Sequence, residues 1–339
     1  MSARARSDCG VTARPAADGH DGGDRAAFEV VTVGRVGVDL YPEDIGVPLA
    51  QVRSFAKSLG GSPTNVAVAA ARLGRRAAVV TKVGDDGFGS YVLSALADFG
   101  VDTRYVGTHP DLRTPITFCE IYPPDYFPLL FYREPTAPDM TIELADLEEP
   151  LATAQIFWTT CTGLSAEPSR SATLAALARR ERQRTTILDL DYRPVFWASP
   201  AEAGRLAREA LALVTVVVGN IEEVAVVVGD RRPADAAAAL LDLGAELAVI
   251  KMGHRGVLAR TAGGIVEVPP VKVNVLNGIG AGDAFGGALC HALLAGTDLP
   301  SSLAYANAAG AIVASRLACA DAMPTADEID HLLRRATDG

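Results

Sequence analysis

The sequence predicts an α/β fold with a mostly parallel central sheet, helices flanking both faces of the sheet, and a small β-strand lid. From residue 28 onward, short apolar runs rich in Val and Ile alternate with Ala- and Leu-rich helical patterns. Continuous apolar runs are typical of parallel strands that are covered on both faces. No linker rich in Pro, Gly or Ser divides the chain. We therefore expect a single domain over residues 28–335.

Six apolar runs are predicted as strands and six stretches between them as helices. The strands are expected at 30–33, 77–83, 155–159, 185–189, 214–218 and 248–251. The helices are expected at 65–73, 91–99, 171–182, 200–213, 234–243 and 283–295. Because ligands of open parallel sheets bind beyond the carboxyl ends of the strands, we expect the functional site there.

Two segments, near 38–59 and 105–133, break this alternation. Both carry alternating polar and apolar residues interrupted by Pro, as in Thr117-Phe118-Cys119-Glu120-Ile121-Tyr122. They predict short antiparallel strands that leave the main sheet and cover an active site or an interface. Their exposed edges also suit pairing with a second subunit, so a homodimer through the lid is a candidate assembly.

Composition excludes several classes of protein. The formal net charge of −10 argues against non-specific nucleic-acid binding, and no apolar run approaches the roughly 18 residues of a membrane span. The five cysteines are scattered without a Cys-x-x-Cys pair, which predicts reduced thiols in the cytoplasm rather than disulfides or a zinc site. Residues 1–27 lack periodicity and the apolar core of a signal peptide, so we expect a disordered extension.

The glycine-rich stretch Gly278-Ile279-Gly280-Ala281-Gly282-Asp283 runs directly into an apolar helical pattern. A glycine-rich turn at a helix start leaves backbone N–H groups free to hold an anion, most often phosphate. Asp283 beside that anion would act as a proton acceptor, so the stretch predicts phosphoryl transfer. No Gly-Lys-Ser or Gly-Lys-Thr occurs, and the glycine spacing fails the dinucleotide fingerprint. The alternative is an ordinary turn with Asp283 as the helix cap.

Near the N-terminus, Asp39 follows the first predicted strand, and the motif Gly60-Gly61-Ser62-Pro63-Thr64-Asn65 opens a helix. Paired glycines permit close backbone approach, and an asparagine offers both a donor and an acceptor. These residues could together bind adjacent hydroxyls of a sugar. Alternatively, the acid caps a turn and the asparagine caps the helix.

Two arginines stand at or just after the ends of predicted elements. Arg133 closes the second excursion, and Arg193 follows Asp189 and Asp191 after a central strand. An arginine at such a position can bind a carboxylate or phosphate bidentately. The alternatives are a solvated surface residue for Arg133, and an ion pair with one of the two aspartates for Arg193.

Two further motifs follow strands. Asn220 and Glu223 share one helix face and could order a water-bound Mg²⁺ near a polyphosphate, although a capping box explains the same spacing. Lys251, Gly253 and Gly256 follow the next strand. The two glycines let the backbone approach a flat ligand.

In this order, the motifs Gly60-Gly61 with Asn65, Asn220-x-x-Glu223, Gly253-x-x-Gly256 and Gly280-Ala281-Gly282-Asp283 resemble the ribokinase-like (PfkB) carbohydrate kinases. The resemblance covers nearly everything from residue 28 to 333 and implies ATP and Mg²⁺ as cofactors, with a monovalent cation as a further candidate. It implies Asp283 as the base; Gly280, Ala281 and Gly282 as the anion hole; Asp39, Gly60, Gly61, Asn65, Arg133 and Arg193 around the sugar; and Asn220, Glu223, Lys251, Gly253, Gly256 and Asn307 around ATP, with Asn220 and Glu223 reaching Mg²⁺ through water.

One motif departs from the family. The family usually has Asp-Thr-Thr before Gly-Ala-Gly-Asp, whereas this chain has Asn277-Gly278-Ile279. The departure leaves the anion hole and the base in place. It changes the residues that normally contact the nucleotide or a monovalent cation.

Within the family, the segments 37–49, 117–120 and 127–133 are similar to the branch that phosphorylates 5-dehydro-2-deoxy-D-gluconate to its 6-phosphate in myo-inositol catabolism. The pattern Asp-x-x-Tyr-Arg-Pro-x-x-Trp at 189–197 is shared with kinases of 2-keto-3-deoxygluconate. The resemblance therefore implies an ATP-dependent kinase of a sugar acid. The alternatives are 2-keto-3-deoxygluconate or fructose as substrate and, more remotely, a non-catalytic sugar-binding regulator.

Overall fold

The computed structural model describes residues 28–337 and has a nine-stranded central sheet. The spatial order of its strands is β13-β12-β11-β10-β9-β8-β1-β4-β5. Neighbours from β5 through β11 pair in parallel, and β12 and β13 add an antiparallel hairpin at one edge. The strands are β1 (Val30–Val33), β4 (Ala77–Gly84), β5 (Val106–His109), β8 (Ile156–Thr160), β9 (Thr186–Asp189), β10 (Val216–Asn220), β11 (Leu247–Lys251), β12 (Val257–Thr261) and β13 (Gly264–Val268).

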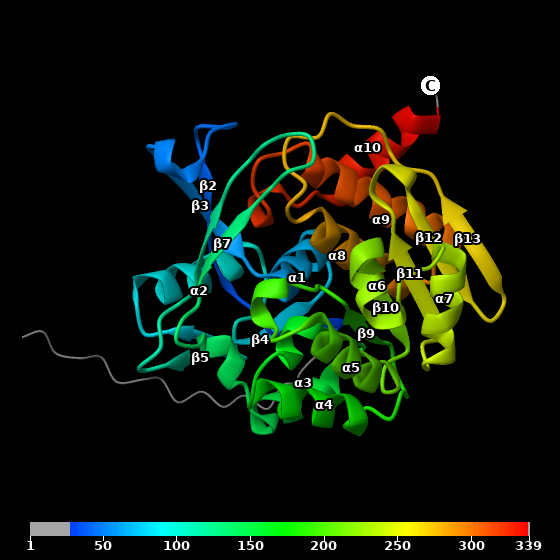
Figure 1. Cartoon of the computed structure of the whole chain (residues 1–339), viewed down its shortest axis with the longest axis horizontal. Coiled ribbons are helices and arrows are strands. Elements are labelled where there is room, and N and C mark those ends of the chain that lie inside the picture. The colour runs from blue at the N-terminus through cyan, green and yellow to red at the C-terminus, as the bar shows by residue number, and fades with distance from the viewer. Residues whose placement is uncertain (1–27, 338–339) are drawn as a thin grey trace, which may run out of the picture.

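Helices cover both faces of this sheet, as Figure 1 shows. One face packs against α1 (Ser62–Arg72), α2 (Gly87–Asp98), α8 (Ala281–Leu294), α9 (Leu299–Ala314) and α10 (Ala326–Thr337). The other packs against α3 (Leu144–Thr153), α4 (Ser169–Arg179), α5 (Pro200–Leu211), α6 (Ile221–Val228) and α7 (Pro233–Asp242). Each face has its own hydrophobic core, so the central strands are apolar on both sides. The expected α/β architecture is confirmed.

A second sheet of four strands forms the lid, in the order β3-β2-β6-β7. Its strands are β2 (Gly37–Pro42), β3 (Phe55–Gly60), β6 (Ile116–Cys119) and β7 (Leu129–Tyr132). The pairs β2–β3 and β6–β7 are antiparallel, but β2 and β6, which join the two excursions, pair in parallel. The lid stands beside the core at one end of the sheet, as Figure 1 shows.

The structure corrects one boundary of the lid. β5 lies within the segment predicted to leave the main sheet, yet it pairs in parallel with β4 at the sheet edge. The excursion therefore begins after His109 rather than at Tyr105. β5 is short and half polar, as strands at the edge of a sheet often are. Its sequence pattern therefore does not distinguish it from a strand of the lid.

The extension predicted for residues 1–27 lies outside the described residues. Among residues 28–337, no helix is both long and apolar enough to cross a membrane.

Candidate active site

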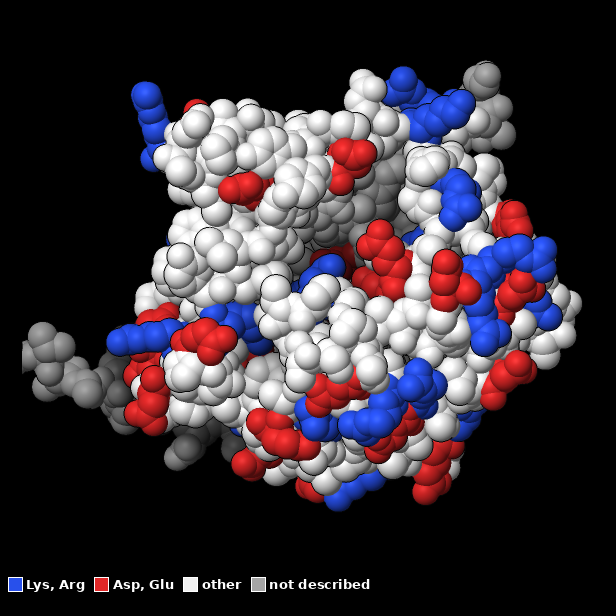
Figure 2. Space-filling model, viewed as in Figure 1, with Lys and Arg blue, Asp and Glu red and all other residues white. Residues whose placement is uncertain are grey.

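A cleft of about 1000 Å³ lies between the lid and the carboxyl ends of the central strands. Asp189, Asn220 and Lys251 are the last residues of β9, β10 and β11, and all three line the cleft. Figure 2 shows the molecule hollowed at this face, with acidic and basic side chains around the opening. The cleft thus lies at the edge of the sheet where the sequence predicts the site.

The structure brings most of the predicted site residues together around this cleft. Gly60 and Arg133 are the exceptions, since neither is among the lining residues. The predicted residues that do line it are Asp39, Gly61, Asn65, Arg193, Asn220, Glu223, Lys251, Gly253, Gly256, Gly280, Ala281, Gly282, Asp283 and Asn307.

The start of α8 has the geometry expected of the predicted anion-binding turn. Gly280 precedes the helix with a left-handed φ of 83°, and a Cβ on this residue would collide with the sulfur of Cys319. Ala284 donates to the Gly280 carbonyl at 2.9 Å. The N–H groups of Gly282 and Asp283 come before this bond, in the first helical turn, where backbone donors have no partner within the helix. They line the cleft and are free to bind an anion.

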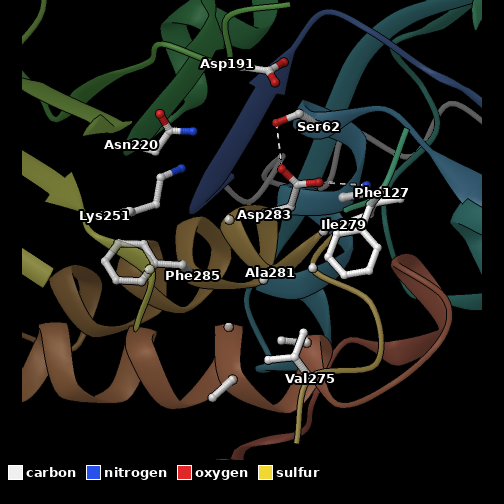
Figure 3. A pocket seen from close by; sticks show the side chains of 18 of the residues that line it. Ser62, Phe127, Asp191, Asn220, Lys251, Val275, Ile279, Ala281, Asp283 and Phe285 are labelled. Atoms are coloured by element: carbon white, nitrogen blue, oxygen red, sulfur yellow. Dashed lines mark hydrogen bonds between the residues drawn. The ribbon is translucent and has the colours of Figure 1, made fainter. Parts of the chain in front are cut away.

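Asp283 is held from both sides by α1. Ser62 donates its hydroxyl to Oδ1 and Asn65 donates its amide to Oδ2, each at 2.8 Å. Figure 3 shows the Asp283 carboxylate close to Ser62, with Lys251 on the other side of the space that it faces. Burial and then the charge of Asp191 raise the pKa of Asp283, although the two hydrogen bonds oppose this. A carboxylate with a raised pKa is a better proton acceptor near neutral pH.

The lid presents a second carboxylate to the cleft. Asp39 lies on β2, is paired in register with Thr117 of β6, and is only 7% exposed. Burial raises the pKa of Asp39 to about 6, against the opposing charge of Arg35. Gly61 has φ of 101° and its backbone lies against Arg35, while a side chain at Gly60 would collide with the Asp39 carboxylate. The glycine pair therefore makes room for the lid.

The two predicted arginines have different surroundings. Arg193 lines the cleft and pairs with Asp191 at 3.0 Å, so the ion-pair alternative is confirmed. Arg133 binds the buried Asp139 with both terminal nitrogens, at 3.1 and 2.5 Å. Arg133 is thus neither a solvated surface residue nor a lining residue.

On the opposite side, Asn220 and Glu223 form a capping box. The Asn220 side chain accepts from the Glu223 N–H, and the Glu223 carboxylate accepts from the Asn220 N–H, both at 2.8 Å. The capping alternative is confirmed, and both residues also line the cleft. Asn307 lies farther along α9 and donates to the Pro269 carbonyl.

Lys251 brings a positive charge to the middle of the cleft, where Figure 3 shows it reaching toward Asp283. Burial opposes its protonation, but the charges of Asp189, Glu223 and Asp283 raise the pKa of the ammonium group. Beyond it, Gly253 and Gly256 both have positive φ, and a Cβ on Gly256 would collide with the backbone of β13.

Asn277, the first residue of the stretch that departs from the family motif, holds the loop together. Its side chain is fully buried, donates to the Leu317 carbonyl at 2.5 Å and accepts from the Ile279 N–H at 3.0 Å. It closes the loop before the anion-binding turn.

Sequence reasoning missed Ser62, Arg35, Asp191 and Thr117, which the fold brings to the site. The hydrogen bonds of Ser62 to Asp283 and of Arg35 to Asp191 join positions more than 150 residues apart. No local pattern reports such pairings.

A phosphotransferase is the class of protein that this fold and site define. An anion-binding helix start, a carboxylate of raised pKa and a cationic lysine meet in one cleft at the carboxyl ends of parallel strands.

The chain belongs to the pfkB family of carbohydrate kinases, whose family model matches residues 27–326. A 5-dehydro-2-deoxygluconokinase of Bacillus subtilis is 32% identical to it over 313 residues, covering 91% of this chain and 96% of the relative. Relatives of the same name in other bacteria are 31–33% identical.

Two solved structures show the same ribokinase-like fold. A candidate ribokinase II of Escherichia coli, in complex with ATP and Mg²⁺, has a TM-score of 0.83 and 25% identity, covering 91% of this chain and 99% of that chain. A fructokinase double mutant of Vibrio cholerae, with fructose, ADP and potassium bound, has a TM-score of 0.80 and 27% identity, covering 91% and 100%.

Proposed function

We propose that this kinase transfers the γ-phosphoryl group of ATP to the C6 hydroxyl of 5-dehydro-2-deoxy-D-gluconate. The observation that carries the proposal is the position of Asp283, which lies beside the anion-binding turn and within reach of Ser62 and Asn65. The curated relatives that share most of the chain's length and bear the name 5-dehydro-2-deoxygluconokinase support the choice of substrate.

In the proposed reaction Asp283 accepts the C6 hydroxyl proton as the oxygen attacks the γ-phosphorus. The bond between that phosphorus and its bridging oxygen breaks, and ADP leaves. The N–H groups of Gly280, Gly282 and Asp283 and the ammonium group of Lys251 stabilise the negative charge on the transferring group, while the Ala281 N–H donates to the Gly278 carbonyl at 3.4 Å. Asp39, Gly61 and Asn65 orient the sugar, and closure of the lid would exclude water.

On the nucleotide side, Gly253, Gly256 and Asn307 would contact ATP. Among residues 28–337, no group of three or more His, Cys, Asp or Glu is arranged to hold a metal ion. The residues present fit an Mg²⁺ that is held by phosphates and water, with Asn220 and Glu223 ordering its water. When bound, Mg²⁺ would neutralise charge on the phosphates. A monovalent cation, as in the fructokinase structure, remains a candidate cofactor.

Two further proposals concern the whole protein. Leu130 and Tyr132 project from the same face of β7 and are 47% and 59% exposed, which suits a homodimer formed through the lid. The four cysteines in the described residues are all free and buried, which suits a cytoplasmic location.

The substrate proposal is tested by measuring ADP release in a coupled assay with 5-dehydro-2-deoxy-D-gluconate, 2-keto-3-deoxygluconate and fructose. We expect the highest kcat/KM for the first. Fructose turned over as efficiently as either acid would contradict the proposal and favour a fructokinase.

A further inference from the structure

Arg35 is a buried arginine that the fold leaves without adequate partners. It follows β1, is 8% exposed, and lines the sugar end of the cleft beside Asp39 and Thr117. A guanidinium group has five N–H donors, and burial of donors that lack acceptors is costly. The number of its hydrogen-bond partners therefore indicates whether Arg35 has a structural role or binds a ligand.

Within residues 28–337, Arg35 has a single ionic contact, from Nη2 to Asp191 at the long distance of 3.4 Å. Its Nε atom is buried without any hydrogen-bond partner. The guanidinium carbon lies 5.7 Å from the ring centre of Phe131 and 5.9 Å from that of Phe196. Rings at this distance attract a cation but accept no strong hydrogen bond.

Arg180 is a matched internal comparison, because it is 7% exposed. It donates from Nε to the Thr186 hydroxyl at 2.8 Å and from its terminal nitrogens to four backbone carbonyl oxygens. Arg133 likewise donates from both terminal nitrogens to Asp139. Every guanidinium nitrogen of Arg180 thus has a partner within the fold, whereas the Nε of Arg35 has none.

The charges around Arg35 point to the kind of ligand. Arg35 and Arg193 both contact Asp191, which is 3% exposed. Within residues 28–337, Asp191 is the one carboxylate in direct contact with these two guanidinium groups, while Asp39 acts on Arg35 and Asp189 on Arg193 at longer range. The Nε of Arg193 is also buried without a partner. Two free donors of this kind suit the paired oxygens of a carboxylate.

We propose that Arg35, together with Arg193, binds the C1 carboxylate of the sugar acid, and that Arg35 is the residue that makes the site prefer an acid to a neutral sugar. This inference rests on the proposed function. Arg133 then has a positioning role, because its partner Asp139 also accepts the backbone N–H of Val36 at 3.0 Å, directly beside Arg35.

The test compares 5-dehydro-2-deoxy-D-gluconate with its neutral C1 amide on the wild type, Arg35→Met and Arg35→Lys. Methionine keeps part of the apolar stem, and lysine keeps the charge but loses the fork. Arg75→Met is the matched control, since Arg75 pairs with Glu29 beside the amino end of β1 and does not line the cleft.

We expect Arg35→Met to raise KM for the acid roughly ten- to a hundredfold, as the loss of a charge-assisted hydrogen bond does. KM for ATP should stay within about twofold, and the preference for acid over amide should collapse. Arg35→Lys should recover part of that preference, and Arg75→Met should match the wild type.

An unchanged preference for acid over amide in Arg35→Met would overturn the inference. If Arg35→Met does not fold, as judged by circular dichroism, Arg35→Lys is used instead. A KM for the acid in Arg35→Lys equal to that of the wild type would then overturn the inference. A wild type that binds the acid more tightly than the amide by calorimetry, but does not phosphorylate it, would contradict the proposed function alone. Equal binding of both by the wild type would contradict the inference.

Discussion

Asp283 combines the two properties that a general base in this cleft needs. Its carboxylate is oriented by Ser62 and Asn65, and burial together with the charge of Asp191 raises its pKa. The orientation comes from a helix more than 200 positions away in the sequence, so the local motif predicts the base but not its supports.

Asp283→Asn should remove basicity while keeping the shape of the side chain. We expect kcat to fall by about 10² or more, the lower end of general-base contributions. ATP affinity, measured by calorimetry, should change little because the backbone donors of the turn remain. Near wild-type turnover in this variant would show that another group takes the proton.

Asp39 links the site to the pH dependence of stability. Burial raises its pKa to about 6 from an ordinary 3.8, so between these values the folded protein holds a proton that the unfolded chain releases. Its contribution to stability is therefore present at low pH and lost as the pH rises through about 6.

Asp39→Asn should remove this dependence. Between pH 5 and 8, the wild type should lose about 1–2 kcal/mol of unfolding free energy that the variant retains. Urea unfolding of both proteins at the two pH values gives the difference, and groups common to both, such as Asp189, cancel. Parallel changes in the two proteins would contradict the raised pKa.

At the scale of elements, the start of α8 depends on two glycines in different ways. Gly280 has a left-handed φ and packs against Cys319, whereas Gly282 is helical and lies near Lys251. The first requires glycine for its backbone, and the second for the space that it leaves beside Lys251 at the proposed phosphate site.

Gly280→Ala should destabilise the protein by at least 1–2 kcal/mol, roughly the cost of a left-handed conformation, and weaken ATP binding. Gly282→Ala should keep stability within about 1 kcal/mol, because alanine suits a helix, while still raising KM for ATP. Urea unfolding and calorimetry separate the two effects. Equal loss of stability in both variants would contradict these roles.

The sequence predicts elements well where periodicity is strong. All six predicted strands and all six predicted helices are present, with ends shifted by a few residues. Strand β5, the hairpin of β12 and β13, and helices α3, α6, α9 and α10 lie outside these twelve predicted ranges. Helix α9 is not predicted because its small residues give it little amphipathic character. Helix α3 is not predicted because it contains Pro150, a residue that usually interrupts a helix. The parallel pairing of β4 with β5 depends on distant partners.

At the scale of the whole molecule, the arrangement of lid and core follows from topology rather than from any single motif. β2 and β6 come from separate excursions and pair through the register of Asp39 with Thr117. That pairing brings one carboxylate from the lid and one from α8 to the same cleft. The sequence indicates both carboxylates, but the fold shows that Arg35 and not Arg133 lines the space between lid and core.

The lid also carries the prediction about assembly. Replacing both Leu130 and Tyr132 by Glu should convert a dimer into monomers in sedimentation velocity, because like charges would then face each other across the interface. The control is Arg205→Glu on α5, which places a new negative charge on an exposed surface away from the lid. A wild type that sediments as a monomer would contradict the proposed dimer.

The transfer of phosphate to one primary hydroxyl is the central claim, and phosphorus NMR of the reaction product tests it most directly. With ATP, Mg²⁺ and 5-dehydro-2-deoxy-D-gluconate, we predict a phosphomonoester signal split into a triplet by the C6 methylene protons, formed in step with ADP. A doublet from a secondary alcohol, or inorganic phosphate without any ester, would contradict the account.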